Sequence, residues 1–210
     1  MRVLTDPALR GASLDAYLAV AGAGLRAALL DPAAIIPEIE AAGLRGLGGA
    51  GFPAHRKWAA VAAAPGPGRW IIANGNEDEP GTFKDRFLLA ETPHQVIEGA
   101  LVAAVAVRAA QVALYVNPRE PATVAGLRDA AAQWAAHPLL AEVSAAVGEA
   151  VALRVVESSG LYIGGEETAA VASVQGGFPF PSLKPPFPAQ HGVHGAPTLV
   201  TNVETLAQAG

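Results

Sequence analysis

The chain has 210 residues, 51% of them hydrophobic and 16% charged, with a formal net charge of −5. It contains no cysteine, which excludes disulfides, thiolate metal sites and any iron–sulfur cluster held by this chain itself. Because it has neither a block of basic residues nor an N-terminal apolar core of signal-peptide length, we expect a cytoplasmic protein that does not bind nucleic acid.

The apolar pattern predicts helices that alternate with three strands. Asp31–Pro32 and Thr92–Pro93 each have the form of an N-cap followed by proline at the first helical position. Arg108 and Gln111 interrupt the apolar run 99–116, so we interpret it as a buried helix leading into a strand and not as a membrane span. In chain order we expect helices 13–30 and 31–42, strand 69–74, helices 82–91 and 92–110, strand 111–117, helix 118–138, strand 152–158, helix 165–176 and a helix starting at 202.

This alternation indicates an α/β fold, a Rossmann-like parallel sheet flanked by helices. In such sheets ligands bind at the carboxyl ends of the strands. The stretches NGNEDEPG (74–81) and SSGLYIGGEET (158–168) both follow predicted strands, so we expect both on the ligand edge. The glycine-rich stretch GLRGLGGAGFP (43–53) precedes the first strand and can reach that edge only by folding over it.

The glycine-rich stretch is the first candidate site. Glycine lets the backbone approach a ligand closely, so that successive amides can point at phosphate oxygens, and Lys57 would add a positive charge. The spacing matches neither a dinucleotide fingerprint nor a Walker loop. A plain mobile loop is therefore the alternative interpretation.

The second candidate is the polar loop that contains Asn74, Asn76, Glu77, Asp78 and Glu79. Its amides could hydrogen-bond the edge of a planar heterocycle, and its three acids could instead bind a hard cation. A solvated acidic turn remains the simplest alternative.

The third candidate places Glu166 and Glu167 at a predicted helix start, after two glycines and near Tyr162. Acids in a first helical turn complement the helix dipole, which is a purely structural explanation. The bare backbone beside an aromatic ring also suits a flat ligand.

In the proline-rich passage 178–197, Lys184 and Phe187 could be held over a cleft, although an ordered surface loop explains them equally well. His191 and His194 lie in the same passage without a nearby carboxylate, so we do not expect a metal site there.

Taken together and in order, these stretches resemble one family. The motifs are GLRGLGGAGFP followed by KW, then NGNEDEPGTFKDR, TPHQVIEG, YIGGEETA, LKPPFPA and NVETLA. Their order is similar to that in the NADH-oxidising flavoprotein subunit of respiratory complex I, whose domain also occurs in NAD-reducing hydrogenases and NAD-dependent formate dehydrogenases. The resemblance runs from about Ile35 to Ala207.

The resemblance implies non-covalent FMN, a hydride taken from NADH, and single electrons passed to a separate iron–sulfur protein or subunit. The acid that matches Glu167 implies a preference for NADH over NADPH. The matching positions imply that FMN is bound by Gly46, Gly48, Gly49, Lys57, Asn74, Asn76, Glu77, Tyr162, Gly165, Glu166 and Asn202. They imply that the NADH site is shaped by Phe52, Glu79, Glu167, Lys184 and Phe187.

The sequence also departs from the family pattern. Loss of the aromatic that stacks on adenine, where this chain has Ala60, is expected to weaken NADH binding by about 1 kcal/mol. We expect an N-terminal helical segment (1–30) and one FMN/NADH-binding domain (31–210), without the family's ubiquitin-like and cluster-binding domains. The other departures from the pattern are Leu47, Ala54, His55, Asn76, Gly164, Ser182 and Thr201.

Three functional hypotheses follow. The first is an FMN-dependent NADH oxidoreductase module that feeds electrons to an iron–sulfur partner. The second is a non-catalytic scaffold or docking subunit that keeps the fold without the flavin. The third is a flavin- or nucleotide-binding module that works without NADH.

Overall fold

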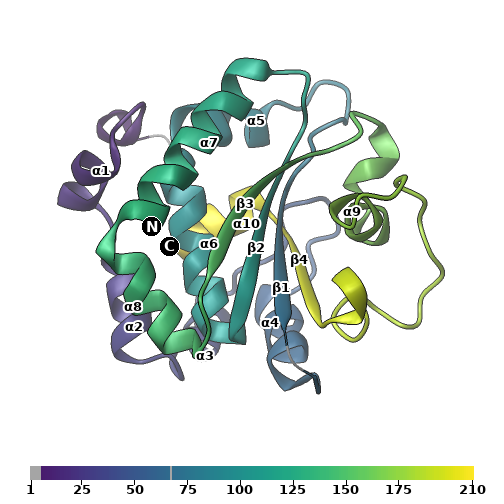
Figure 1. Cartoon of the computed structure of the whole chain (residues 1–210), viewed down its shortest axis with the longest axis horizontal. Coiled ribbons are helices and arrows are strands. Elements are labelled where there is room, and N and C mark those ends of the chain that lie inside the picture. Colours follow the sequence, from purple (N-terminus) through teal and green to yellow (C-terminus); the bar gives the residue numbers. More distant parts are fainter. Residues whose placement is uncertain (1–5, 67) are drawn as a thin grey trace.

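The computed structural model describes residues 6–66 and 68–210 and contains a four-stranded parallel sheet (Figure 1). The strand order is β3-β2-β1-β4, and every neighbouring pair is parallel. This confirms the α/β fold class. The strands are β1 (Arg69–Gly75), β2 (Ala109–Val116), β3 (Ala152–Glu157) and β4 (Thr198–Asn202).

The helices of the described chain follow the predicted order with several corrections. The helices are α1 (Leu14–Val20), α2 (Ala23–Leu30), α3 (Ile35–Ala41), α4 (Ala54–Ala63), α5 (Lys84–Glu91), α6 (Pro93–Val107), α7 (Pro121–Ala136), α8 (Pro138–Val147), α9 (Glu167–Val174) and α10 (Val203–Ala209). Short 3₁₀ turns lie at Pro7–Leu9, Tyr162–Gly165 and Val193–Gly195.

Several expectations need correction. The single helix expected over 13–30 is two helices, because Gly22 adopts a left-handed conformation with φ of 83° between them. Helix α6 ends earlier than expected, at Val107, where Arg108 adopts a left-handed conformation. Helices α4 and α8 and strand β4 were not predicted, and β4 directly follows the proline-rich passage 178–197.

The two faces of the sheet are covered by different helices. Figure 1 shows α6, α7 and α8 on one side of the strands and α9 on the other. Alternate strand residues follow this division: Ile71 belongs to the larger apolar cluster with α6, whereas Ile72 packs in a smaller cluster with Ala170 and Val171 of α9. Within the described residues, no helix is long and apolar enough to cross a membrane.

The N-terminal helices pack against α6. The Tyr17 hydroxyl and the Leu25 amide both donate to the carboxylate of Glu98, which is fully buried on α6. Leu14 and Leu25 also belong to the main apolar cluster. The segment before residue 31 therefore shares its core with the rest of the chain, and a separate boundary at residue 30 stays a prediction.

The strand order reverses direction at one point of the sheet. The chain runs outward from β1 to β2 and β3, then returns to place β4 on the opposite side of β1. Ligands in such sheets bind where the order reverses, outside the carboxyl ends of the strands. Here that point lies between β1 and β4, where Asn74 and Asn202 are partners in register.

Candidate functional site

The glycine loop, residues 43–53, lies against the end of β4 and the start of α10, at this switch point. The Leu47 amide donates to Thr205 Oγ1 at 2.9 Å, and a Cβ placed on Gly48 would lie 3.4 Å from Asn202 Cβ. The base of the loop is closed by a hydrogen bond from the Gly46 amide to the Phe52 carbonyl, at 2.8 Å. The loop does fold over the ligand edge, as the sequence predicted.

The tip of the loop leaves its backbone bare. Gly48 and Gly49 are exposed, and within the described chain their amides donate no hydrogen bond. Gly49 has φ of 119°, which disfavours any side chain, and a Cβ there would meet nothing within 4 Å. Backbone donors without a partner among the described residues therefore lie at the switch point of the sheet, beside Asn202.

The two polar loops predicted at the ligand edge are joined to each other. Asn74 Nδ2 donates to the Gly165 carbonyl at 2.9 Å, and Asn74 Oδ1 accepts from the Asn76 amide at 3.1 Å. The Asn76 side chain accepts from the Ser158 hydroxyl and donates to the Leu161 carbonyl at 3.4 Å. Both ends of its carboxamide are thus used within the protein.

Three further predicted residues hold the starts of helices. The Glu77 carboxylate, 4% exposed, accepts from the Asp85 and Arg86 amides at 3.0 and 3.2 Å at the start of α5. Glu166 accepts from the Thr168 and Ala169 amides of α9, at 2.7 and 3.0 Å. Asn202 accepts from the Glu204 amide of α10 at 3.0 Å. These side chains shape the site by fixing where helices begin.

A network of ion pairs joins three separate segments beside the loop. Lys57 of α4 contacts Glu167 Oε2 at 2.9 Å and the Val200 carbonyl at 3.1 Å. Lys184 contacts Glu167 Oε1 at 2.9 Å and Glu166 Oε1 at 3.0 Å. Both oxygens of Glu167 are therefore bound to lysines that come from different elements.

The network shifts the pKa values of Glu166, Glu167 and Lys184. Burial alone would raise the pKa of Glu166 and of Glu167, but hydrogen bonds outweigh burial and lower both pKa values. The donors are Thr168, Ala169 and Lys184 for Glu166, and the two lysines for Glu167. The hydrogen bond to Glu167 raises the pKa of Lys184. These shifts favour the charged forms of Glu166, Glu167 and Lys184.

A cleft of about 470 Å³ opens next to this network. Phe52 and Phe187, each about half exposed, line it together with Lys57 and Glu167. The remaining lining residues are Arg56, Ala60, Ala63, Ala64, Pro65, Pro188, Ala189, Gln190, Thr198 and Val200. Three of the residues predicted for the dinucleotide, Phe52, Glu167 and Phe187, thus share one largely apolar cleft.

Two predicted residues bridge the polar loops outside this cleft. The Tyr162 hydroxyl donates to Glu79 Oε2 at 2.7 Å, and the Tyr162 side chain is 66% exposed. The hydrogen bond to Glu79, together with the charge of that carboxylate, raises the pKa of Tyr162. The pair connects the loop after β1 with the turn before α9.

Sequence reasoning missed Lys84 and Asp85, which hold Asn202. Lys84 Nζ donates to Asn202 Oδ1 at 3.1 Å, and Asn202 Nδ2 donates to Asp85 Oδ2 at 2.7 Å. Burial raises the pKa of Asp85, and hydrogen bonds from Lys84 and Asn202 oppose that rise. The available signal was the position of FKDR (83–86), one residue after the polar loop NGNEDEPG.

The sequence matches the family described as Nuo51 FMN-binding domain over residues 39–209. It is 41% identical over 197 residues to a protein of the NADH-quinone oxidoreductase of Aquifex aeolicus (strain VF5), covering 93% of this chain and 46% of that protein. It is 41% identical over 177 residues to the mitochondrial NADH dehydrogenase [ubiquinone] flavoprotein 1 of Dictyostelium discoideum, covering 83% of this chain and 37% of that one.

The fold is also found in a solved enzyme. A chain in the crystal structure of the H₂-reduced NAD⁺-reducing [NiFe]-hydrogenase superposes with a TM-score of 0.77 at 36% identity, covering 95% of this chain and 34% of that one. The chain spans less than half the length of these relatives. With the motifs, the switch-point loop and these similarities in agreement, the chain belongs to the Nuo51 FMN-binding domain family.

Proposed function

We propose that this chain is the flavin module of an NADH oxidoreductase, which binds FMN, oxidises NADH and delivers electrons to a separate iron–sulfur protein. The observation that carries the proposal is the bare glycine loop folded over the β1–β4 switch point, with an apolar cleft beside it. Membership of the FMN-binding family supports it.

The residues at the switch point fit FMN. The free amides of Gly48 and Gly49 are suited to phosphate oxygens, and Lys57 lies close enough to the edge to bond the Val200 carbonyl of β4. When bound, FMN supplies a hydride acceptor that can release its electrons singly. The protein supplies position and electrostatics to the flavin.

The proposed flavin residues divide into two groups. The first group is proposed to contact FMN directly or to form the loop that does, and it consists of Gly46, Gly48, Gly49, Lys57 and Tyr162. The others already have hydrogen bonds within the protein and are proposed to hold the walls of the site: Asn74, Asn76, Glu77, Gly165, Glu166 and Asn202.

The cleft is proposed to receive NADH. Phe52 and Phe187 offer exposed aromatic surface for its flat rings, and Glu167 lines the cleft while Lys184 donates to its carboxylate. Glu79, held by Tyr162, is proposed to border the same substrate. This chain has no cysteine to hold a cluster, so we propose that the electrons pass to an iron–sulfur partner and that the module works in the cytoplasm as an input unit.

A second candidate is a docking subunit that has kept the fold and lost the flavin. It is favoured by the satisfied state of Asn76, Glu77 and Glu166, whose polar groups need no ligand to complete their hydrogen bonds. The two proposals differ in one property, because only the first requires FMN.

Titrating FMN with the protein and measuring the quenching of FMN fluorescence distinguishes the flavin module from the docking subunit. The wild type should bind one FMN, and Gly48→Leu should lose at least tenfold in affinity, because a Cβ at Gly48 would already lie 3.4 Å from Asn202 Cβ and the longer side chain would fill the space between the loop and the end of β4. Gly126→Leu on α7, where a Cβ meets nothing within 4 Å, is the matched control and should bind normally. Absence of FMN binding by the wild type would contradict the proposal and favour the docking subunit.

A further inference from the structure

One face of α4 forms a wall of the cleft. Arg56, Ala60 and Ala63 all line the cleft and are spaced by four and then three residues along the helix. Residues at this spacing lie on the same helical face. The two alanines leave room over the helix, and Arg56 stands at the N-terminal end of the same stripe.

The charge on Arg56 is not compensated. Its side chain is exposed, and its guanidinium forms no hydrogen bond or ion pair with any residue of the described ranges 6–66 and 68–210. By contrast, the other two charged residues of the lining, Lys57 and Glu167, are paired at 2.9 Å. The cleft therefore has one free positive charge beside an apolar floor.

This combination selects a chemical class of ligand. The alanines and the exposed rings of Phe52 and Phe187 suit a flat, largely apolar ring. A free guanidinium suits a phosphate group, to which it can donate two parallel hydrogen bonds. A ring and a phosphate a few bonds apart describe a nucleotide.

We propose that Arg56 binds a phosphate of the adenosine half of the dinucleotide, an inference that rests on the proposed function. That phosphate is either the pyrophosphate, which NADH and NADPH share, or the 2′-phosphate that only NADPH carries. Glu167 does not forbid the second case, because its carboxylate is bound by Lys57 and Lys184 and its charge is offset.

The test uses two ligands without a nicotinamide, so that no redox reaction occurs. Binding of ADP-ribose and of 2′-phospho-ADP-ribose to the FMN-supplied protein is measured by calorimetry for the wild type and Arg56→Gln. The variant should bind one or both about tenfold more weakly, as expected for loss of a charge-assisted hydrogen bond.

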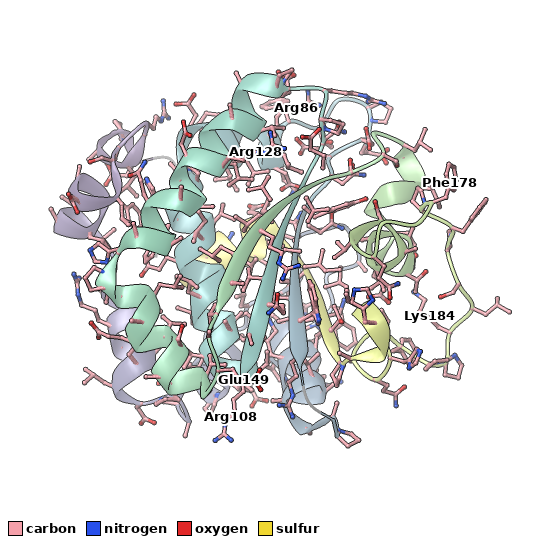
Figure 2. The ribbon with its side chains drawn as sticks, viewed as in Figure 1. Arg86, Arg108, Arg128, Glu149, Phe178 and Lys184 are labelled. Carbon is pink, nitrogen blue, oxygen red and sulfur yellow. The ribbon has the colours of Figure 1, made fainter. Side chains whose placement is uncertain are left out.

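Arg108→Gln is the matched control, because it removes the same charge from another exposed arginine. Figure 2 shows Arg108 at the bottom of the molecule, away from Lys184 at the right. This control should bind both ligands as the wild type does. Equal thermal midpoints for the two variants would show that both are folded.

The outcomes are distinct. If Arg56→Gln lowers the affinity for both ligands equally, Arg56 contacts the pyrophosphate. If it lowers the affinity for 2′-phospho-ADP-ribose alone, Arg56 contacts the 2′-phosphate. Unchanged binding by Arg56→Gln, or equal weakening by Arg108→Gln, overturns the inference. If wild-type FMN is reduced by NADH while Arg56→Gln binds normally, only this inference fails; if the wild type binds neither ligand, the proposed function fails with it.

Discussion

Glu77 shows how a residue predicted for the flavin site is used inside the protein. Its buried carboxylate accepts two backbone amides at the start of α5 and contacts Arg86 Nε at 3.4 Å. Glu77→Ala should lower the free energy of unfolding by about 1–3 kcal/mol, because these donors lose their acceptor. Urea denaturation measures the change. Glu120→Ala removes an exposed ion pair with Arg86 and should change the free energy of unfolding by less than about 1 kcal/mol. Equal losses of unfolding free energy in the two variants would contradict this account.

His94 makes stability depend on pH. It is buried on α6, and burial lowers its pKa from the ordinary value of 6.5, although a hydrogen bond with the Ala12 backbone opposes the shift. The unfolded chain therefore takes up a proton below pH 6.5 before the folded chain does, so stability is lost as the pH falls from 6.5 through the folded pKa.

The measurement is the thermal midpoint between pH 8 and pH 5, a range set by the ordinary titration of histidine. His94→Gln should lower the midpoint at pH 8 and reduce its slope below pH 6.5. His191→Gln, at an exposed position, is the control and should keep the wild-type slope. A slope that survives in His94→Gln would show that another group is responsible.

At the residue scale, the sequence predicted which residues gather at the edge but not the hydrogen bonds that they make within the protein. Asn76 was predicted to contact a ligand, yet its partners Ser158 and Leu161 lie more than eighty positions away in the chain. Long-range hydrogen bonds of this kind depend on the finished fold, so local pattern could not reveal them. The roles of Lys84 and Asp85 were missed for the same reason.

Among the elements, the crossing of α6 and α10 depends on one glycine. A Cβ on Gly99 would lie 1.8 Å from the Leu206 carbonyl oxygen, which is backbone and cannot rotate away. Gly99→Ala should therefore cost at least about 3 kcal/mol or prevent folding, because the helices would have to separate and lose packing.

Gly126→Ala on α7 is the control for this change. Nothing lies within 4 Å of a Cβ at that position, and alanine is the better helix former by about 1 kcal/mol, so this variant should be slightly more stable than the wild type. Thermal and urea unfolding of both variants measure the difference. Similar stability of the two would show that the helices do not cross as described.

Element prediction succeeded where the signals were local. The apolar runs of β1, β2 and β3 and the proline at the start of α6 were interpreted correctly from the sequence. Gly22 breaks the N-terminal helix because of its backbone conformation, a property that helical spacing does not encode. Strand β4 has only five residues and follows Pro197, so the turn signals around it outweighed its apolar character.

On the scale of the whole molecule, the sequence predicted a parallel sheet with a ligand edge but not the strand order. The site depends on that order, because β4 returns beside β1 and brings Asn202 next to Asn74 and the glycine loop. No repeat or spacing in the chain specifies which strands become neighbours. The order follows from how the helices pack on both faces.

For the molecule as a whole, we propose that this edge holds FMN within reach of NADH in the adjacent cleft. The visible spectrum of the FMN-supplied protein, recorded without oxygen before and after addition of NADH, tests that claim most directly. We predict that the bands of oxidised flavin bleach when NADH is added. Protein-bound flavin whose bands remain unchanged in excess NADH would contradict the claim.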